Sequence, residues 1–189
     1  ENDVDTYCSS HSTKFDMIIN AAAVAPLPDN QVNHNRSLAI NVGTVGSLID
    51  FMIKTGCRRM LHFSSSAVYE GLPSKITSGH EIGQRLDPHL MYPISKYLSE
   101  VYLKAQAEVY GLDIIALRLF NLYGPRQDYF RKQTPLLGYL IKNIIQKKPV
   151  MLFASPKAKR DYVYILDLIN FIKIIMNQSF IEKRYKAVN

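Results

Sequence analysis

Three kinds of side chain near the middle of the sequence have the chemistry needed for proton transfer. Tyr92 and Lys96 are four positions apart in a segment with helical periodicity, so they share one helix face about a turn apart. The serines Ser65 and Ser66 follow an apolar run that reads as a strand. Ligands of doubly wound sheets bind where strands end, so these side chains predict a reaction site.

The reaction that these side chains could carry out depends on the pKa of the Tyr92 phenol. A tyrosine has a pKa near 10, and action as a base near neutral pH needs a drop of roughly 3 pH units, or about 4 kcal/mol. A desolvated Lys96, together with the positive ring of an oxidised nicotinamide, would favour the phenolate of Tyr92. Ser65 or Ser66 would hydrogen-bond the same substrate oxygen and hold it in line for hydride departure. Three groups around one carbinol predict a redox site.

The elements that must position these side chains alternate between strands and helices. Alternating or continuous apolar residues predict strands at 16–20, 59–63, 114–119 and 150–153, whereas helical periodicity predicts helices at 37–55, 93–110, 136–147 and 166–176. Right-handed crossover helices between strands give a mainly parallel sheet with helices on both faces. The predicted fold class is therefore α/β, doubly wound and Rossmann-like.

Two predicted helices carry a regular apolar face and a glycine at the end. In the first, the face consists of Leu38, Val42, Val45, Ile49 and Met52, and Gly56 follows in the left-handed cap position. In the second, Pro93 stands at the predicted first residue, and the helix runs to Gly111. The face of this second helix is predicted to consist of Ile94, Leu98, Val101, Ala105 and Val109.

Composition indicates an ordinary globular protein. The 189 residues are 47% hydrophobic and 21% charged. Apolar runs are shorter than the ~18 residues of a membrane span, and the polar start does not resemble a secretory signal. Cys8 and Cys57 have neither disulfide-framework nor zinc-site spacing. We expect a cytoplasmic protein without a metal or a membrane partner.

The net charge of +7 is spread along the chain. Basic residues occur in small separated groups, and the aromatic-rich signatures of RNA-binding domains and the zinc-finger pattern do not occur in the sequence. We therefore expect a phosphorylated small molecule, and not a nucleic acid, as the anionic partner.

Six segments in order carry a family resemblance. They are Asp16–Ala23, Asn41 with Gly43–Thr44, Phe63–Tyr69, Tyr92 with Ser95–Lys96, Arg118–Arg126, and Arg160–Tyr164 with Asp167. Together they resemble the extended short-chain dehydrogenase/reductase family, in particular the NAD-dependent nucleotide-sugar epimerases and dehydratases of the UDP-glucose 4-epimerase type. The matches run from residue 16 to residue 167 and cover most of the chain.

The resemblance implies a cofactor and a substrate. The cofactor is NAD, and the residues implied to bind it are Ala21, Ala22, Ala23, Asn41, Tyr92, Lys96 and Phe120. The substrate is a nucleotide-diphosphate sugar, implied to contact Ser65, Asn121 and Arg160. For Arg160 there is an independent reason, because a guanidinium can bind pyrophosphate oxygens in a bidentate way.

The resemblance also narrows the reaction. Counting back from Val68–Tyr69 selects Ser65 as the catalytic serine and counting forward from Phe63 selects Ser66; we prefer Ser65. The related 4,6-dehydratases carry an Asp-Glu pair just after the catalytic hydroxyl, where this chain has Ser66–Ala67. This favours epimerisation through transient oxidation at C4 of the sugar. An NADPH-dependent sugar-nucleotide 4-reductase and a catalytically idle nucleotide-binding module remain as alternatives.

Finally, the resemblance predicts how the chain is organised. Residues 1–125 would be part of a dinucleotide-binding domain, and 126–189 part of a small substrate-binding region interleaved with the last Rossmann elements. Helices 37–55 and 93–110 resemble those that pair across the family's dimer interface, so we expect a homodimer. The Gly-rich loop and the residue that distinguishes NAD from NADP should precede residue 16, and 182–189 complete no predicted element, so we expect a chain truncated at both ends.

Overall fold

The computed structural model describes residues 6–7, 14–24, 33–70, 88–131, 134–152, 155, 157–178 and 184–189. These residues form two compact units. The first consists of Glu1–Leu119 with Gln178–Asn189, and the second of Phe120–Asn177. Most of the predicted loop from Gly71 to His89 lies outside the described residues.

The first unit is built on a parallel sheet of four strands. These are β1 (Ile18–Asn20), β2 (Arg59–Ser65), β3 (Asp113–Leu119) and β6 (Tyr185–Val188), in the order β1-β2-β3-β6. Because all four run the same way, their carboxyl ends meet at one edge of the sheet. The parallel α/β fold predicted from the sequence is confirmed, whereas the prediction that 182–189 complete no element is wrong, since β6 pairs with β3.

The first predicted helix is continuous but contains an irregular turn. It consists of α3 (His34–Leu38), a π-helical turn η1 (Ala39–Gly43) and α4 (Thr44–Thr55). Val45, Ile49 and Met52 are buried as the periodicity predicts, and Gly56 ends the helix with a φ of 71°. A single π-turn widens the helix and shifts the faces of the residues before it, which regular spacing does not reveal.

Helix α5 (Met91–Tyr110) buries a different face from the predicted one. Leu98, Val101 and Val109 are exposed, although their spacing predicted a core-facing stripe. The face that is buried instead consists of Pro93, Ser95, Lys96, Ser99, Glu100, Leu103 and Ala107. Its polar members are bonded inside the protein, and hydrogen-bonded polar groups can be buried without a large penalty.

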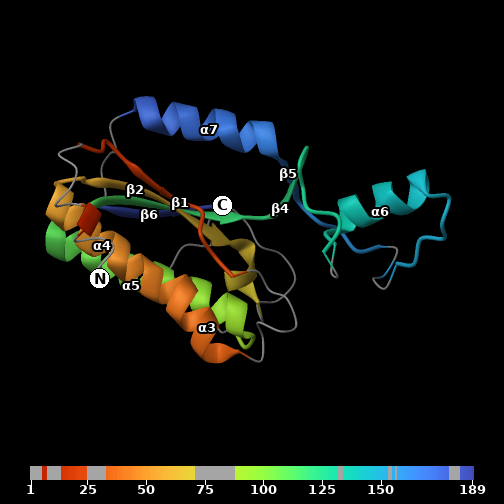
Figure 1. The fold of residues 1–189 in the computed structure, drawn as a ribbon, viewed down its shortest axis with the longest axis horizontal. Coiled ribbons are helices and arrows are strands. Elements are labelled where there is room, and N and C mark those ends of the chain that lie inside the picture. Colours follow the sequence, from red (N-terminus) through yellow and green to blue (C-terminus); the bar gives the residue numbers. More distant parts are fainter. Residues whose placement is uncertain are drawn as a thin grey trace. The chain divides into compact units, whose positions relative to one another are not determined.

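Helices α4 and α5 lie side by side against one face of the sheet (Figure 1). The core between them and the sheet includes Ile49, Met52, Met60, Leu103 and Ile114. By length and composition alone, the helix His34–Thr55 could also cross a membrane. In this fold Val45, Ile49 and Met52 of this helix are buried in the core of the first unit.

The second unit has a small parallel ladder between β4 (Asn121–Tyr123) and β5 (Tyr162–Tyr164). Its helices are α6 (Leu136–Ile145) and α7 (Ile165–Asn177), close to the predicted ranges. Gly124 has a φ of 152°, and a Cβ there would lie 2.3 Å from the Ile165 side chain. The strand predicted at 150–153 is wrong for its described part, 150–152, which has no regular structure.

Candidate active site

The carboxyl end of β2 brings the predicted serine and tyrosine together. Ser65 is the last residue of β2 and caps the 3₁₀ turn η2 (Ser66–Tyr69), its Oγ accepting a hydrogen bond from the Ala67 amide at 3.1 Å. The same side chain forms a hydrogen bond with the phenol of Tyr92, the second residue of α5. This geometry favours Ser65 over Ser66 as the serine of the site.

Lys96 lies one turn further along α5 and is 3% exposed. Its Nζ donates a hydrogen bond of 2.6 Å to the carbonyl oxygen of Phe63 and lies 6.0 Å from the centroid of the Tyr92 ring. Burial lowers the pKa of Lys96 to about 8, and the carboxylate of Glu100 opposes this shift. The desolvated lysine expected beside Tyr92 is thus present.

The pKa of Tyr92 behaves differently from the expectation. Burial raises the pKa of this phenol, and the hydrogen bond with Ser65 acts in the opposite direction. The chain's own groups therefore favour the neutral phenol. We expected the Lys96 ammonium to supply much of the lowering of the Tyr92 pKa. The structure does not support this expectation, because the net effect of burial is to raise that pKa.

Asn41 holds the segment after β1 against the start of α5. Its Oδ1 accepts a hydrogen bond from the Val24 amide at 2.7 Å, and its Nδ2 donates to Ser95 Oγ at 2.9 Å. Ser95 Oγ in turn donates to the Tyr92 carbonyl at 2.8 Å. The π-turn leaves the Asn41 carbonyl to accept a 2.8 Å bond from Ser99 Oγ. A contact between Asn41 and the cofactor stays a prediction, while its hydrogen-bond link through Ser95 to the Tyr92 backbone is part of the structure.

The segment Ala21–Ala23 fits a flat cofactor ring. All three alanines are exposed directly after β1, at the sheet edge where β2 also ends. Their small side chains leave the backbone accessible, and Asn20 Oδ1 fixes it by accepting a hydrogen bond from the Ala22 amide at 3.1 Å. With Lys96 as a donor at the same edge, the residues present are suited to a ribose and a nicotinamide ring.

A buried ion pair beside the site was not anticipated from the sequence. Arg118 on β3 and Glu100 on α5 pair at 2.8 Å, with both side chains 0% exposed. Ser64 Oγ donates a hydrogen bond to Glu100, and Arg118 also donates to the Tyr69 hydroxyl at 2.6 Å. A sequence signal did exist for Glu100, because it stands four residues after Lys96 on the same helix face.

His62 is a further buried group on β2. It is 1% exposed, and its Nδ1 lies 3.1 Å from Asn20 Nδ2. Burial, and then the charge of Lys96, lower its pKa to about 3, so the ring is neutral at physiological pH. Within the described residues its Nε2 atom has no hydrogen-bond partner.

The remaining predicted residues belong to the second unit. Phe120 is half-buried and directly follows β3. Asn121 is exposed and bonds Asp161 O through its Nδ2 at 2.8 Å, while Arg160, also exposed, donates to Lys159 O at 3.0 Å. That these three residues share one site with Tyr92 stays a prediction.

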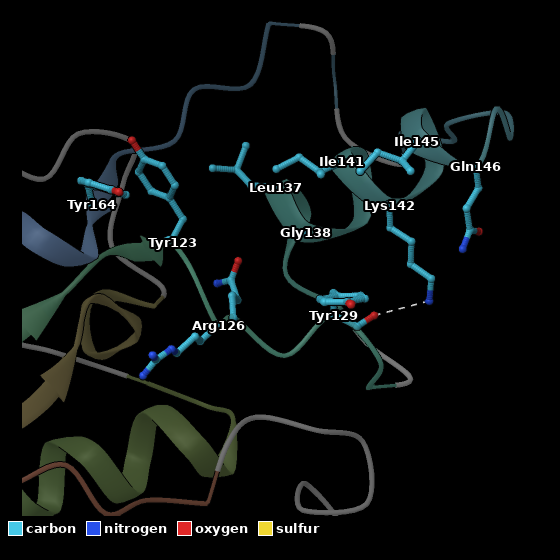
Figure 2. Close-up of a pocket in the computed structure, with 12 residues that line it drawn as sticks. Tyr123, Arg126, Tyr129, Leu137, Gly138, Ile141, Lys142, Ile145, Gln146 and Tyr164 are labelled. Atoms are coloured by element: carbon cyan, nitrogen blue, oxygen red, sulfur yellow. Dashed lines mark hydrogen bonds between the residues drawn. The ribbon is translucent and has the colours of Figure 1, made fainter.

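The second unit also contains a pocket of about 590 Å³ (Figure 2). Tyr123 and Tyr164 line it from the strands, and Leu137, Ile141 and Lys142 line it from α6. Phe120, Asn121 and Arg160 are not among its lining residues. The residues that line the pocket are therefore different from the predicted substrate contacts of this unit.

A parallel sheet with covering helices, and with a serine, a tyrosine and a lysine at the carboxyl ends of its strands, defines a Rossmann-like domain. The comparison with known families agrees: the model of the NAD dependent epimerase/dehydratase family matches residues 1–189. The chain belongs to this family.

The individual curated relatives share about a quarter of their aligned residues with this chain. A Bacillus subtilis protein named as an uncharacterized UDP-glucose epimerase, YtcB, is 26% identical over 164 residues, covering 86% of this chain and 49% of the relative. The dTDP-4-dehydro-6-deoxyglucose reductase of Escherichia coli is 28% identical over 161 residues, covering 85% of this chain and 49% of the relative. The chain thus spans about half the length of these curated relatives.

Among solved structures, the chain resembles the UDP-N-acetylglucosamine 4-epimerase of Methanobrevibacter ruminantium M1 in complex with UDP-N-acetylmuramic acid. The TM-score is 0.81 at 25% identity, over 92% of this chain and 54% of that one. This likeness agrees with the fold derived above.

Proposed function

We propose that the chain belongs to an NAD-dependent epimerase acting on a nucleotide-diphosphate sugar through transient oxidation at C4. The observation that carries this proposal is the contact between Ser65 and Tyr92, with the buried Lys96 one helical turn away. Membership of the NAD dependent epimerase/dehydratase family supports the cofactor. The cytoplasmic setting expected from the sequence belongs to the same proposal.

In this reaction Tyr92 accepts the proton of the C4 hydroxyl and later returns it. Ser65 hydrogen-bonds the same oxygen and keeps it in line with the phenol. Because burial raises the pKa of Tyr92, its phenolate needs positive charge near the ring. Lys96 supplies part of it, since a nearby cation stabilises the charged form of a phenol.

The cofactor would lie along Ala21–Ala23, with Lys96 and Tyr92 as donors to its ribose. When bound, NAD supplies the oxidising group and a positive ring that adds to the charge of Lys96. Asn41 fixes Val24, which directly follows the alanines, at 2.7 Å, and thereby holds this side of the site.

The proposed substrate is a nucleotide-diphosphate sugar. Ser65 contacts the sugar, while Asn121 and Arg160 bind the nucleotide-diphosphate part. Arg160 is exposed, so its guanidinium is accessible to pyrophosphate oxygens. Ser66–Ala67 replace the Asp-Glu pair of the dehydratases, which leaves the elimination of water without its acid and base.

A sugar-nucleotide 4-reductase is the second candidate, because the Escherichia coli reductase is a relative at 28% identity. The two reactions differ in cofactor balance: the epimerase regenerates NAD in each cycle, whereas the reductase consumes NADPH. The idle binding module would bind sugar nucleotides and turn over none of them.

The test uses the protein in its full length with NAD and a panel of UDP-, GDP-, dTDP- and CDP-sugars, and it follows the C4 configuration by proton NMR. Interconversion of C4 epimers without net cofactor consumption supports the proposal. Net oxidation of added NADPH would instead identify the reductase. Saturable binding of a sugar nucleotide without any turnover would identify the binding module.

We also propose a homodimer through helices 37–55 and 93–110. Leu98, Val101 and Val109 are 42%, 42% and 70% exposed on α5, with a spacing that places them along one face. An apolar stripe of this kind suits a helix–helix interface. Sedimentation should give a dimer for the protein and a monomer for Val101→Glu, and a monomeric wild type would contradict the proposal.

A further inference from the structure

The buried pair of Glu100 and Arg118 needs an explanation other than stability. Arg118 Nη2 lies 2.8 Å from Glu100 Oε2, and Arg118 Nε lies 3.2 Å from both carboxylate oxygens. Both side chains are fully buried. Two apolar side chains of similar volume often stabilise a core as well as such a pair does, because removing two charges from water is costly.

The carboxylate of Glu100 is fixed against the strand that carries Ser65. Ser64 Oγ donates a hydrogen bond to Glu100 Oε1, and the Tyr185 hydroxyl lies 3.5 Å from Glu100 Oε2. Arg118 on the neighbouring strand holds both oxygens. Three strands, β2, β3 and β6, therefore fix the position of this negative charge.

Lys96 lies one turn before Glu100 on the same face of α5. Lys96 Nζ bonds the carbonyl of Phe63, and Glu100 accepts from Ser64, so the two side chains bind consecutive residues of β2 just before Ser65. Lys96 is 3% exposed. A buried ammonium loses its charge readily unless a negative group lies nearby.

We propose that Glu100 is a positioning residue of the Tyr92–Lys96 site: its carboxylate, fixed by Arg118 and Ser64, supplies the negative charge that keeps the Lys96 ammonium charged in its buried place. That a charged Lys96 assists proton transfer by Tyr92 rests on the proposed function. The electrostatic link between Glu100 and Lys96 can be measured independently of that function.

Other groups around Lys96 do not supply this charge. His62 on β2 is neutral because burial holds its pKa at about 3, and Arg118 on β3 is a cation. Tyr185 on β6 is neutral because burial raises its pKa, and Tyr69 on η2 accepts a hydrogen bond from Arg118. The ionisable residues of α3 and α4 are all exposed: His34, Arg36, Asp50 and Lys54.

The test is a titration of Lys96 by NMR in protein with ¹³Cε-labelled lysine. The Lys96 signal is assigned by its loss in Lys96→Arg. The wild type should titrate with a pKa of about 8. In Glu100→Gln, which keeps the shape and an acceptor for Ser64 but removes the charge, the Lys96 pKa should fall by about one pH unit or more. Glu108→Gln removes an exposed carboxylate from the same helix and should leave the Lys96 pKa unchanged.

A second variant addresses folding. Glu100→Gln leaves Arg118 buried without its partner, so Glu100→Gln with Arg118→Gln removes the pair as a unit, which a folded core tolerates better. Circular dichroism checks that it is folded. The Lys96 pKa should again lie below the wild-type value.

An unchanged Lys96 pKa in either folded Glu100 variant would overturn the proposal. A double variant that does not fold where the wild type does would also contradict it, because the pair would then serve the fold. The titration requires neither cofactor nor sugar. Failure of the proposed epimerase activity alone would therefore leave the link between Glu100 and Lys96 standing.

Discussion

The two units hold their predicted site residues in different ways. In the first unit, Lys96 and Asn41 are buried and bonded to several elements, and the hydrogen bond between Ser65 and Tyr92 joins a strand end to a helix start. In the second unit, Asn121 and Arg160 are exposed and bonded to nearby backbone carbonyls. Proton transfer requires fixed geometry, whereas binding of a charged nucleotide requires accessible groups.

The largest expected difference between the units is in stability. Arg118→Met leaves the carboxylate of Glu100 buried without a counter-charge, and such a change lowers the free energy of unfolding by about 3–5 kcal/mol. Arg160→Met, the matched change at an exposed arginine, should cost less than about 0.5 kcal/mol. Denaturant unfolding of both variants measures this difference, and similar values for the two would contradict the comparison.

A second effect, smaller over any one pH unit, should appear as a pH dependence of stability. The pKa of His62 is about 3 in the folded protein, against about 6.5 in the unfolded chain. The unfolded chain therefore binds a proton that the folded protein does not, and stability should fall by up to about 1.4 kcal/mol per pH unit as the pH drops from 6.5 toward 3.

Denaturant unfolding at several pH values checks this prediction for His62. In His62→Gln the slope between pH 6.5 and 4.5 should be shallower than in the wild type. His34→Gln, at an exposed position of α3, is the control and should keep the wild-type slope. Equal slopes in all three proteins would remove His62 as the cause.

The smallest expected effect concerns substrate binding by the second unit. Arg160→Met removes a charged donor from the surface and should raise the KM for the sugar nucleotide at least ~10-fold, since hydrogen bonds to charged groups contribute about 1.5–3 kcal/mol. The unfolding free energy should stay unchanged. Lys157→Met, at another exposed cation of the same basic group, is the control. An unchanged KM for Arg160→Met would exclude Arg160 from the binding site.

Much of the fold was predictable, because β2 and β3 each contain a short cluster of apolar residues and glycines end α4 and α5. The buried face of α5 was not. Its inward side contains Ser95, Lys96 and Glu100, which look like solvent-facing residues until their partners on other elements are known. Apolar periodicity then points to the wrong side of the helix.

The candidate site was likewise predictable only in part. Tyr92 and Lys96 are close in sequence, and the serine motif places Ser65 at a strand end. The partner of Glu100 is 18 positions away, on a strand that only the fold brings to α5. The π-turn that contains Asn41 likewise depends on tertiary contacts. The side-chain amide of Asn41 bonds Val24 and Ser95, and its backbone carbonyl accepts from Ser99.

The most direct test of the account is the turnover of Tyr92→Phe in the full-length protein, followed by proton NMR at C4 of the sugar nucleotide. Because the phenol hydroxyl carries the proton, turnover should fall at least ~100-fold. Tyr97→Phe removes a hydroxyl from a half-buried position of the same helix and should stay close to the wild type. Wild-type turnover in Tyr92→Phe would contradict the central claim.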